Sequence, residues 1–166
     1  AYNGEFFALG ETDNKNIYIW KGIPGLNDEP DYIIQNPVGV GRIDMNDEWL
    51  VVSAYPGAGS SVHVINLTNL DSGNMLPIPG NDDFPQGVSI NEKGFFIALQ
   101  GSNKVVGWSS VQEALNGSSP TMSFGGATDK TNSGTKMASS VHWDGFHLWV
   151  GEFKFSNRLL GFAPSK

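Results

Sequence analysis

One block of sequence recurs four times along this chain. Each block contains a polar turn residue, an apolar run, a polar loop and a second apolar run that ends on a large side chain. The first runs lie within residues 3–10, 46–52, 91–101 and 144–151. The second runs end at Trp20, Ile65, Trp108 and Phe162, which are 45, 43 and 54 residues apart. A period of this length predicts an array of small units, each of which buries its apolar surface against its neighbours.

The repeated units are expected to consist of short strands. The 166 residues include 21 glycines and 9 prolines, and glycine and asparagine accept the positive φ that tight hairpins require. Apolar residues alternate only loosely in runs such as 95–99 and 148–150, which indicates strands covered on both faces. The sequence therefore predicts an all-β fold, with β-propeller blades of four antiparallel strands stacked face to face and about 3.5 blades in this chain.

The whole chain, residues 1–166, is expected to form a single partial propeller domain. Its repeat units are about 1–37, 38–81, 82–127 and 128–166. The expected strands are 5–9, 16–20, 31–35, 40–45, 49–53, 61–66, 75–78, 87–90, 95–99, 104–108, 121–124, 139–143, 148–152 and 158–162. Ser110 and Glu113 have the spacing of a capping box, and Asn116-Gly117 can end a helix, so one helical turn is expected between them.

Composition excludes several classes of partner. The net charge is −7, and the ten Lys and Arg residues are scattered singly, whereas nucleic-acid binding requires a clustered basic face. No apolar run approaches the roughly 18 residues that span a bilayer. The chain has no cysteine, which excludes disulfides and thiolate metal sites. The expected partner is therefore a protein or a small polar ligand.

Several segments resemble NHL-type propeller repeats. Residues 103–108 and 157–162 resemble the ending of that repeat, which consists of Asn, Arg, two aliphatic residues, any residue and an aromatic residue. Residues 87–91 and 148–150 resemble its first half. Residues 20–24, with Pro30 beyond them, are similar to a turn in a secreted bacterial and archaeal variant. The resemblance covers nearly the whole chain, although residues 60–65 lack the Asn-Arg pair, and it implies an extracellular or periplasmic location.

The repeats that the chain resembles specify blade packing rather than catalysis, so the expected function is a non-enzymatic binding or scaffold module. The resemblance leaves one alternative open, a metal-dependent lactonase or lyase with its ligands in the axial channel. The first unit begins almost one strand late and the fourth ends one strand early, which would leave apolar faces and strand edges uncovered. We therefore expect self-association, or the remaining blades of a longer propeller, to complete the ring.

No catalytic residue is predicted from the sequence. Residues 57–61 lack the Gly-x-Ser-x-Gly spacing of a serine nucleophile. Residues 125–131 superficially resemble a phosphate loop, but Asp129 stands where glycine must precede Lys130, and its carboxylate would repel phosphate.

No resident cofactor is predicted either, although zinc and calcium are alternatives. The densest set of possible metal ligands is His142, Asp144, His147 and Glu152. The repeat favours structural roles for this set, because His147 aligns with the packing residue Trp49 and Asp144 aligns with the turn residue Asn46. Calcium could bind the acidic loops 11–14, 27–31 and 81–83, for which solvated turns are the simpler interpretation.

Propellers commonly bind ligands at the axial mouth, near the starts of the inner strands. The polar residues expected nearest to this mouth are Arg42, Gln86, Ser140 and His142, for which the alternative is again a role in turns. The negative net charge favours a polar or cationic ligand. Burial between blades is expected for Trp20, Trp49, Val88, Phe96, Trp108 and Leu148.

Overall fold

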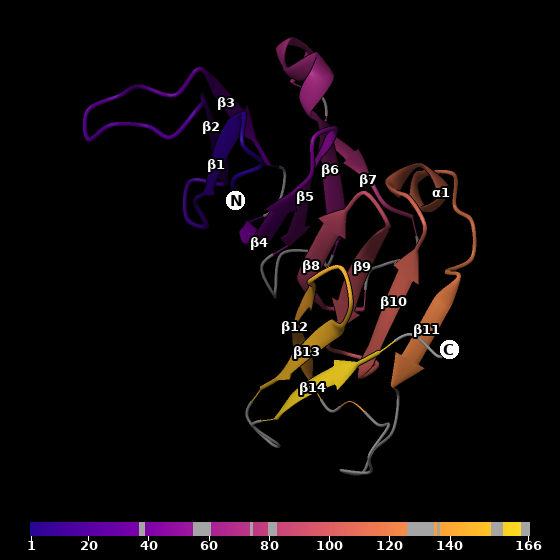
Figure 1. Ribbon diagram of the computed structural model, residues 1–166. Coiled ribbons are helices and arrows are strands. Elements are labelled where there is room, and N and C mark those ends of the chain that lie inside the picture. Colours follow the sequence, from indigo (N-terminus) through magenta and orange to yellow (C-terminus); the bar gives the residue numbers. More distant parts are fainter. Residues whose placement is uncertain are drawn as a thin grey trace.

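The computed structural model of this chain contains four antiparallel sheets, each made of strands that are consecutive in the sequence (Figure 1). The structure describes residues 1–36, 39–54, 61–73, 75–79, 83–125, 135, 137–153 and 158–163. We call the four sheets blades 1 to 4. Blade 1 contains β1 (Phe6–Gly10), β2 (Asn16–Lys21) and β3 (Tyr32–Gln35). Blade 2 contains β4 (Val40–Met45), β5 (Trp49–Ala54), β6 (Val62–Asn66) and β7 (Met75–Pro77).

Blades 3 and 4 follow in the same manner. Blade 3 contains β8 (Pro85–Asn91), β9 (Gly94–Leu99), β10 (Lys104–Trp108) and β11 (Met122–Gly125). Blade 4 contains β12 (Ala138–Trp143), β13 (Leu148–Glu152) and β14 (Leu159–Phe162). Of the described residues, 53% lie in strands and 8% in helices. The predicted all-β fold is confirmed, and both ends of each expected strand lie within two residues of the ends of an observed strand.

Two short helices connect the outer strands. The predicted turn is α1 (Val111–Leu115), where the hydroxyl of Ser110 accepts a hydrogen bond from the backbone N–H of Glu113, as the capping box requires. No repeated pattern predicts η1 (Leu67–Ser72), a 3-10 helix that follows β6. Its start is marked by Asn66, whose side chain accepts a hydrogen bond from the N–H of Thr68.

The blades share one strand order and one register. Strands β4, β8 and β12 open blades 2, 3 and 4, whereas β1 of blade 1 corresponds to β5, β9 and β13. Tyr2 forms an isolated antiparallel bridge with Phe7, and this pair corresponds to Ile90 and Phe95 in blade 3. Blade 4 ends, within the described residues, with β14, which corresponds to β10. The described strands therefore amount to about three and a half blades of four strands each.

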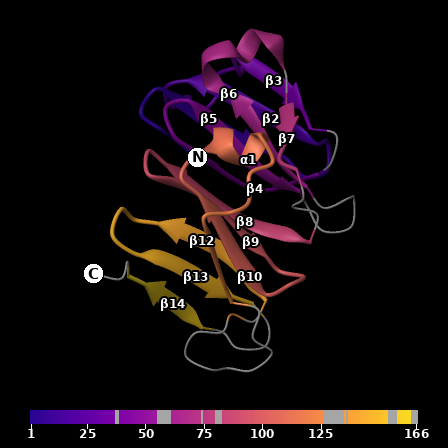
Figure 2. The same ribbon diagram turned by 90° about the vertical axis from the view of Figure 1, so that its right-hand side faces the viewer.

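The blades stack face to face in chain order, and in Figure 2 blades 1 and 2 overlap at the top, blade 3 lies below them and blade 4 lies at the bottom. One apolar cluster lies between each pair of neighbours. In the cluster between blades 2 and 3, for example, the stacked rings of Phe95 and Trp108 of blade 3, with centroids 5.7 Å apart, pack together with Val51 of blade 2. Every residue of β9 is buried, because blades 2 and 4 cover its two faces. This arrangement explains why apolar residues fill both faces of the strand.

Trp20 is the exception among the side chains that were expected to be buried between blades. The other five are buried, whereas Trp20 is only partly buried. Its ring meets the edge of Phe7 at 5.9 Å between centroids, and its indole N–H donates to the carbonyl of Asp28. Trp20 lies on the face of blade 1 that is turned away from blade 2, and no described sheet covers that face.

The repeated polar turn residue has the same role in all four blades. The side chains of Asn3, Asn46, Asn91 and Asp144 each accept backbone N–H groups from the residues that follow, which fixes the turn into the next strand. Two of these residues also join neighbouring blades. The amide of Asn3 donates to the carbonyl of Asn46 over 2.8 Å, and that of Asn46 donates to the carbonyl of Asn91 over 3.5 Å.

Candidate functional site

The opening strands of blades 2, 3 and 4 enclose a groove. Strands β4, β8 and β12 lie beside one another, so that residues far apart in the sequence meet at one surface (Figure 2). The groove has a volume of about 440 Å³. Its lining consists of Arg42, Ile43, Asp44, Gly87, Val88, Ser140, Val141 and His142. The same three stretches of sequence therefore form both the inner edge of the blades and a candidate ligand site.

The groove is made of equivalent positions in three repeats. Counted back from the turn residue of each blade, Arg42, Gly87 and Ser140 occupy one position. Gly87 has no side chain, and a Cβ built there would lie 2.8 Å from the Cα of Ser140 and 2.9 Å from the backbone nitrogen of Val141. Because that space is already occupied by backbone, glycine is needed for β8 and β12 to approach this closely.

Hydrogen bonds between blades fix the walls of the groove. A carboxylate oxygen of Asp44 accepts the N–H of Ile90 over 3.0 Å, and its other oxygen accepts the N–H of Met45. Ser89, at the equivalent position of blade 3, accepts the N–H of Trp143 over 3.2 Å. Both Asp44 and Ser89 thus connect their own opening strand to that of the next blade. Asp44 was not predicted as a site residue, although its position two residues before Asn46 corresponds to that of His142 before Asp144.

The structure brings three of the four residues expected at the axial mouth to the groove. Arg42, Ser140 and His142 line it, and all three are exposed. Gln86 is adjacent to the groove, and its backbone carbonyl accepts a hydrogen bond from the hydroxyl of Ser53. No described residue forms a side-chain hydrogen bond with the guanidinium of Arg42 or the imidazole of His142. These two groups are therefore available to hydrogen-bond a ligand.

The alternative metal set, His142, Asp144, His147 and Glu152, is divided between two ends of blade 4. Asp144 and His147 lie in the turn before β13, whereas Glu152 is at the far end of that strand, roughly 17 Å along at about 3.3 Å per residue. Glu152 is buried and accepts two hydrogen bonds from Arg158, of 2.8 and 2.9 Å. Within the described ranges, no three His, Asp or Glu side chains are grouped as metal ligands.

The turn of blade 4 holds Asp144 through several donors. The indole N–H of Trp149 donates to one carboxylate oxygen over 2.8 Å, and the N–H groups of Phe146 and His147 donate to the other. The indole hydrogen bond, together with the two backbone donors, holds the pKa of Asp144 well below its usual range. His147 was expected in a packing position, but its side chain is 46% exposed and its ring lies 5.7 Å from that of Trp149.

We expect the Asp144→Asn variant to lose less stability in acid than the parent protein does. The carboxylate has a lower pKa in the folded protein than in the unfolded chain, so on acidification the unfolded chain binds the proton first. The contribution of Asp144 is therefore complete at neutral pH and declines below about pH 4. The melting temperature of the parent should exceed that of Asp144→Asn at pH 7 and should approach it as the pH falls below about 4. Identical acid profiles for the two proteins would contradict this assignment.

The acidic loops that were considered for calcium form internal hydrogen bonds. Glu11 accepts hydrogen bonds from the side chains of Asn14 and Tyr18. Asp28 accepts the N–H of Gly25, and Asp31 accepts that of Lys21. Residues 81 and 82 of the third loop lie outside the described residues, as do 57–60 of the serine-containing loop and 126–131 of the phosphate-loop-like segment.

A second hollow, of about 320 Å³, lies between the turns of blades 2 and 3 and the start of α1. Its lining includes the acidic residues Asp47, Glu48 and Glu92. All three are exposed surface residues in hairpin turns. The groove between the opening strands is therefore the stronger candidate, because it gathers polar side chains from two blades against a floor of buried backbone.

Comparisons with known proteins show the fold. No protein-family model matches the sequence, and no curated protein matches it. Among solved structures, the computationally designed Ika4 protein superimposes with a TM-score of 0.65 at 11% identity, covering 99% of this chain and 88% of that chain. A chain of a nidogen/laminin complex gives 0.61 at 12% identity, covering 96% of this chain and 56% of that one.

A third solved structure, hydrazine synthase of Kuenenia stuttgartiensis, gives a TM-score of 0.50 at 14% identity and covers 98% of this chain and 69% of its own. Within the described parts of the chain, no helix has the length and apolar character needed to cross a bilayer. The NHL type of the repeats stays a prediction. Because all these identities are low, the likenesses establish architecture alone, and that architecture is a β-propeller.

Proposed function

We propose that this protein is a non-enzymatic binding or scaffold module that acts outside the cytoplasm and takes a small polar ligand in the groove between β4, β8 and β12. The observation that carries the proposal is the convergence of Arg42 from blade 2 with Ser140 and His142 from blade 4 on one groove. The extracellular or periplasmic location is supported by the resemblance of residues 20–24 to a secreted type of propeller repeat.

The charges of the groove favour a ligand that accepts hydrogen bonds. The carboxylate of Asp44 already binds two backbone N–H groups, whereas the guanidinium of Arg42 has its donors available. A carboxylate paired with Arg42 can form two parallel charge-assisted hydrogen bonds. Hydroxyl groups of the same ligand could bind Ser140 and His142. A hydroxycarboxylate fits this set better than the cationic ligand that the net charge of the chain suggested.

The alternative function, a metal-dependent lactonase or lyase, requires a set of metal ligands in the axial channel. The described residues bring no such set together, so the proposal rests on the donors of the groove. Completion of the propeller by a second copy or by another chain belongs to the same proposal. It is supported by the apolar face of blade 1 that bears Trp20, which no described sheet covers.

An NMR titration with gluconate tests the groove. We expect the amide signals of Gly87 and Ser140 to shift, and we expect the Arg42→Ala, His142→Ala double variant to bind roughly 10 to 100 times more weakly, because it loses a hydrogen bond to a charged group. Lys93→Ala, which removes an exposed cation from the turn between β8 and β9, should bind as the parent does. Equal affinity of the double variant and the parent would refute the proposed site.

Adding glucono-lactone in place of gluconate distinguishes a binding module from a lactonase, because the rate of lactone hydrolysis can be followed. A binding module should leave the rate of lactone hydrolysis at the buffer value, with or without added calcium or zinc. Metal-dependent hydrolysis that is lost in the Arg42→Ala, His142→Ala variant would favour the enzyme instead.

A further inference from the structure

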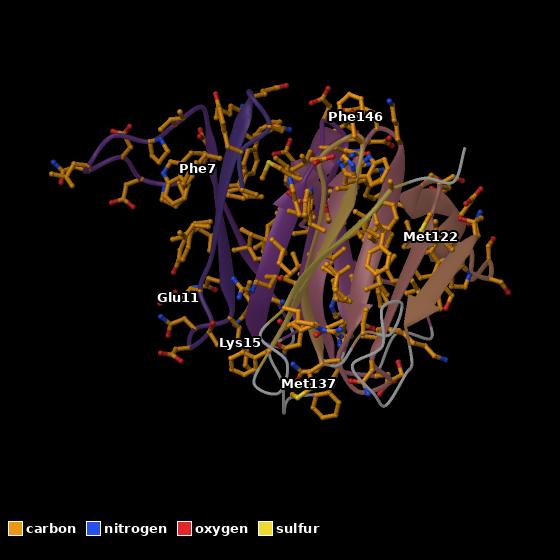
Figure 3. All side chains as sticks on the ribbon, turned by 60° about the horizontal axis from the view of Figure 1, so that its bottom comes forward. Phe7, Glu11, Lys15, Met122, Met137 and Phe146 are labelled. Carbon is orange, nitrogen blue, oxygen red and sulfur yellow. The ribbon has the colours of Figure 1, made fainter. Side chains whose placement is uncertain are left out.

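The face of blade 1 that no described sheet covers is an apolar surface made of three strands. We define the blade-1 outer face as Phe7, Leu9, Tyr18, Trp20 and Ile33. The pairing register places these residues on one side of the sheet, because Phe7 pairs with Trp20, Leu9 pairs with Tyr18, and Tyr18 pairs with Ile33. Leu9 is 49% exposed and Ile33 is 61% exposed. Figure 3 shows Phe7 on the side of β1 that is turned away from the other sheets.

The same face is buried in every other blade. The residues that correspond to Phe7 are Leu50, Phe95 and Leu148, with exposed fractions of 0%, 0% and 2%. In each case the preceding blade covers the residue. The blade-1 outer face therefore corresponds to a surface that contacts another blade everywhere else in the chain, and an apolar surface of this extent indicates an interaction site.

Blade 4, at the other end of the array, exposes the face that in blades 1 to 3 contacts the following blade. We define the blade-4 outer face as Ser140, His142, Trp149 and Leu159, which share the side of blade 4 turned away from blade 3. Trp149 corresponds to Val51 and Phe96, both of which pack against the following blade. Leu159 is 68% exposed.

Hydrogen bonds also recur between the opening strands of neighbouring blades. His142 occupies the position at which Asp44 and Ser89 accept an N–H from the opening strand of the next blade. The donors in those contacts, Ile90 and Trp143, correspond to Tyr2 in blade 1. The blade-1 outer face and the blade-4 outer face thus match the two sides of a contact that the chain already forms three times within itself.

From this match we propose that the blade-4 outer face of one copy of this chain packs on the blade-1 outer face of a second copy. This inference rests on the scaffold part of the proposed function and specifies its partner and its surfaces. Two copies joined twice in this way form a closed ring with two-fold symmetry. If the rotation of each copy does not close the ring, the same contact repeats head to tail into a larger ring or a filament.

Sedimentation equilibrium of the 166-residue chain at micromolar concentration tests the association. We expect a mass of at least twice 17.9 kDa. Leu9→Asp places a charge in the blade-1 outer face and should give a folded monomer. The matched control is Leu76→Asp, because Leu76 is a strand leucine of similar exposure, 42%, on blade 2, and this variant should keep the mass of the parent. A monomeric parent, or a Leu9→Asp variant that keeps the parental mass, would overturn the proposal.

Mixing two defective variants tests the head-to-tail geometry. Leu159→Asp alters the blade-4 outer face and should be monomeric alone, as Leu9→Asp should be. An equimolar mixture retains one intact face of each kind and should form a dimer of twice 17.9 kDa. If Leu159→Asp still associates by itself, or if the mixture stays monomeric while the parent associates, the contact is not head to tail and the proposal is wrong.

The proposed groove site and the proposed association can be refuted separately. Gluconate binding is measured on the monomeric Leu9→Asp variant, because Ser140 and His142 belong both to the groove and to the blade-4 outer face, which no second copy covers in this variant. Binding by this variant together with a monomeric parent would refute the association alone, whereas association of the parent without gluconate binding by this monomeric variant would refute the groove site alone.

Discussion

Replacing Trp108 with alanine should lower the free energy of unfolding by about 3–5 kcal/mol, the usual cost of truncating a buried aromatic side chain. Trp108 is 4% exposed between blades 2 and 3. Its ring stacks on Phe95, and its indole N–H donates to the carbonyl of Ser118 over 2.8 Å. The substitution therefore leaves a cavity in the stack and removes the hydrogen bond to Ser118, and urea denaturation measures the loss.

The control for this prediction is Trp20→Ala in a protein kept monomeric by low concentration. Trp20 occupies the equivalent position of blade 1, but it lies on the outer face and is only partly buried. Its removal should cost much less than that of Trp108. Equal losses for the two variants, or an unchanged midpoint for Trp108→Ala, would contradict the stacking of blades 2 and 3.

The second large effect is expected at Gly87. A Cβ at this position would lie 2.8 Å from the Cα of Ser140, and backbone cannot move aside as a flexible side chain can. Gly87→Ala should cost about 1–3 kcal/mol, as overpacking typically does, and Gly87→Val should cost more. Both changes should also weaken gluconate binding, because they separate β8 from β12 at the floor of the groove.

Gly25→Ala is the matched control for Gly87. Its Cβ would meet only the carboxylate of the exposed residue Asp28, at 3.2 Å, so the neighbour can move. This variant should melt within a few degrees of the parent and bind gluconate equally. If Gly87→Ala were as well tolerated as Gly25→Ala, the close approach of β8 and β12 would be wrong.

The architecture could be predicted because local signals repeat. Turn residues such as Asn46 and Asp144 stand directly before the second strand of each unit, and their side chains bind the backbone that turns there. The 3-10 helix after β6 carries no repeat signal, since the corresponding connections of the other blades differ, and it was missed. Trp20 was misplaced because the repeat aligns it with Trp108, whereas its burial depends on whether a blade lies beyond it.

The candidate site could be predicted only in part. Counting along the repeat places Arg42, Ser140 and His142 near the axis, and the structure puts all three on the groove. The sequence could not show that Asp44 lies there too and binds the N–H of Ile90, because that bond joins two blades. The proximity of His142 to Asp144 in the sequence suggested a metal set, but the turn directs the Asp144 carboxylate to Trp149 instead.

Strands β4, β8 and β12 pack side by side as the inner strands of consecutive blades. The most direct test is a nuclear Overhauser experiment between an α proton of Gly87 and the amide proton of Val141, which are 54 residues apart in the sequence. A Cβ replacing that proton would lie 2.9 Å from the nitrogen of Val141, so we predict a strong cross-peak. Its absence from spectra in which both protons are assigned would contradict the stacking of blades 3 and 4.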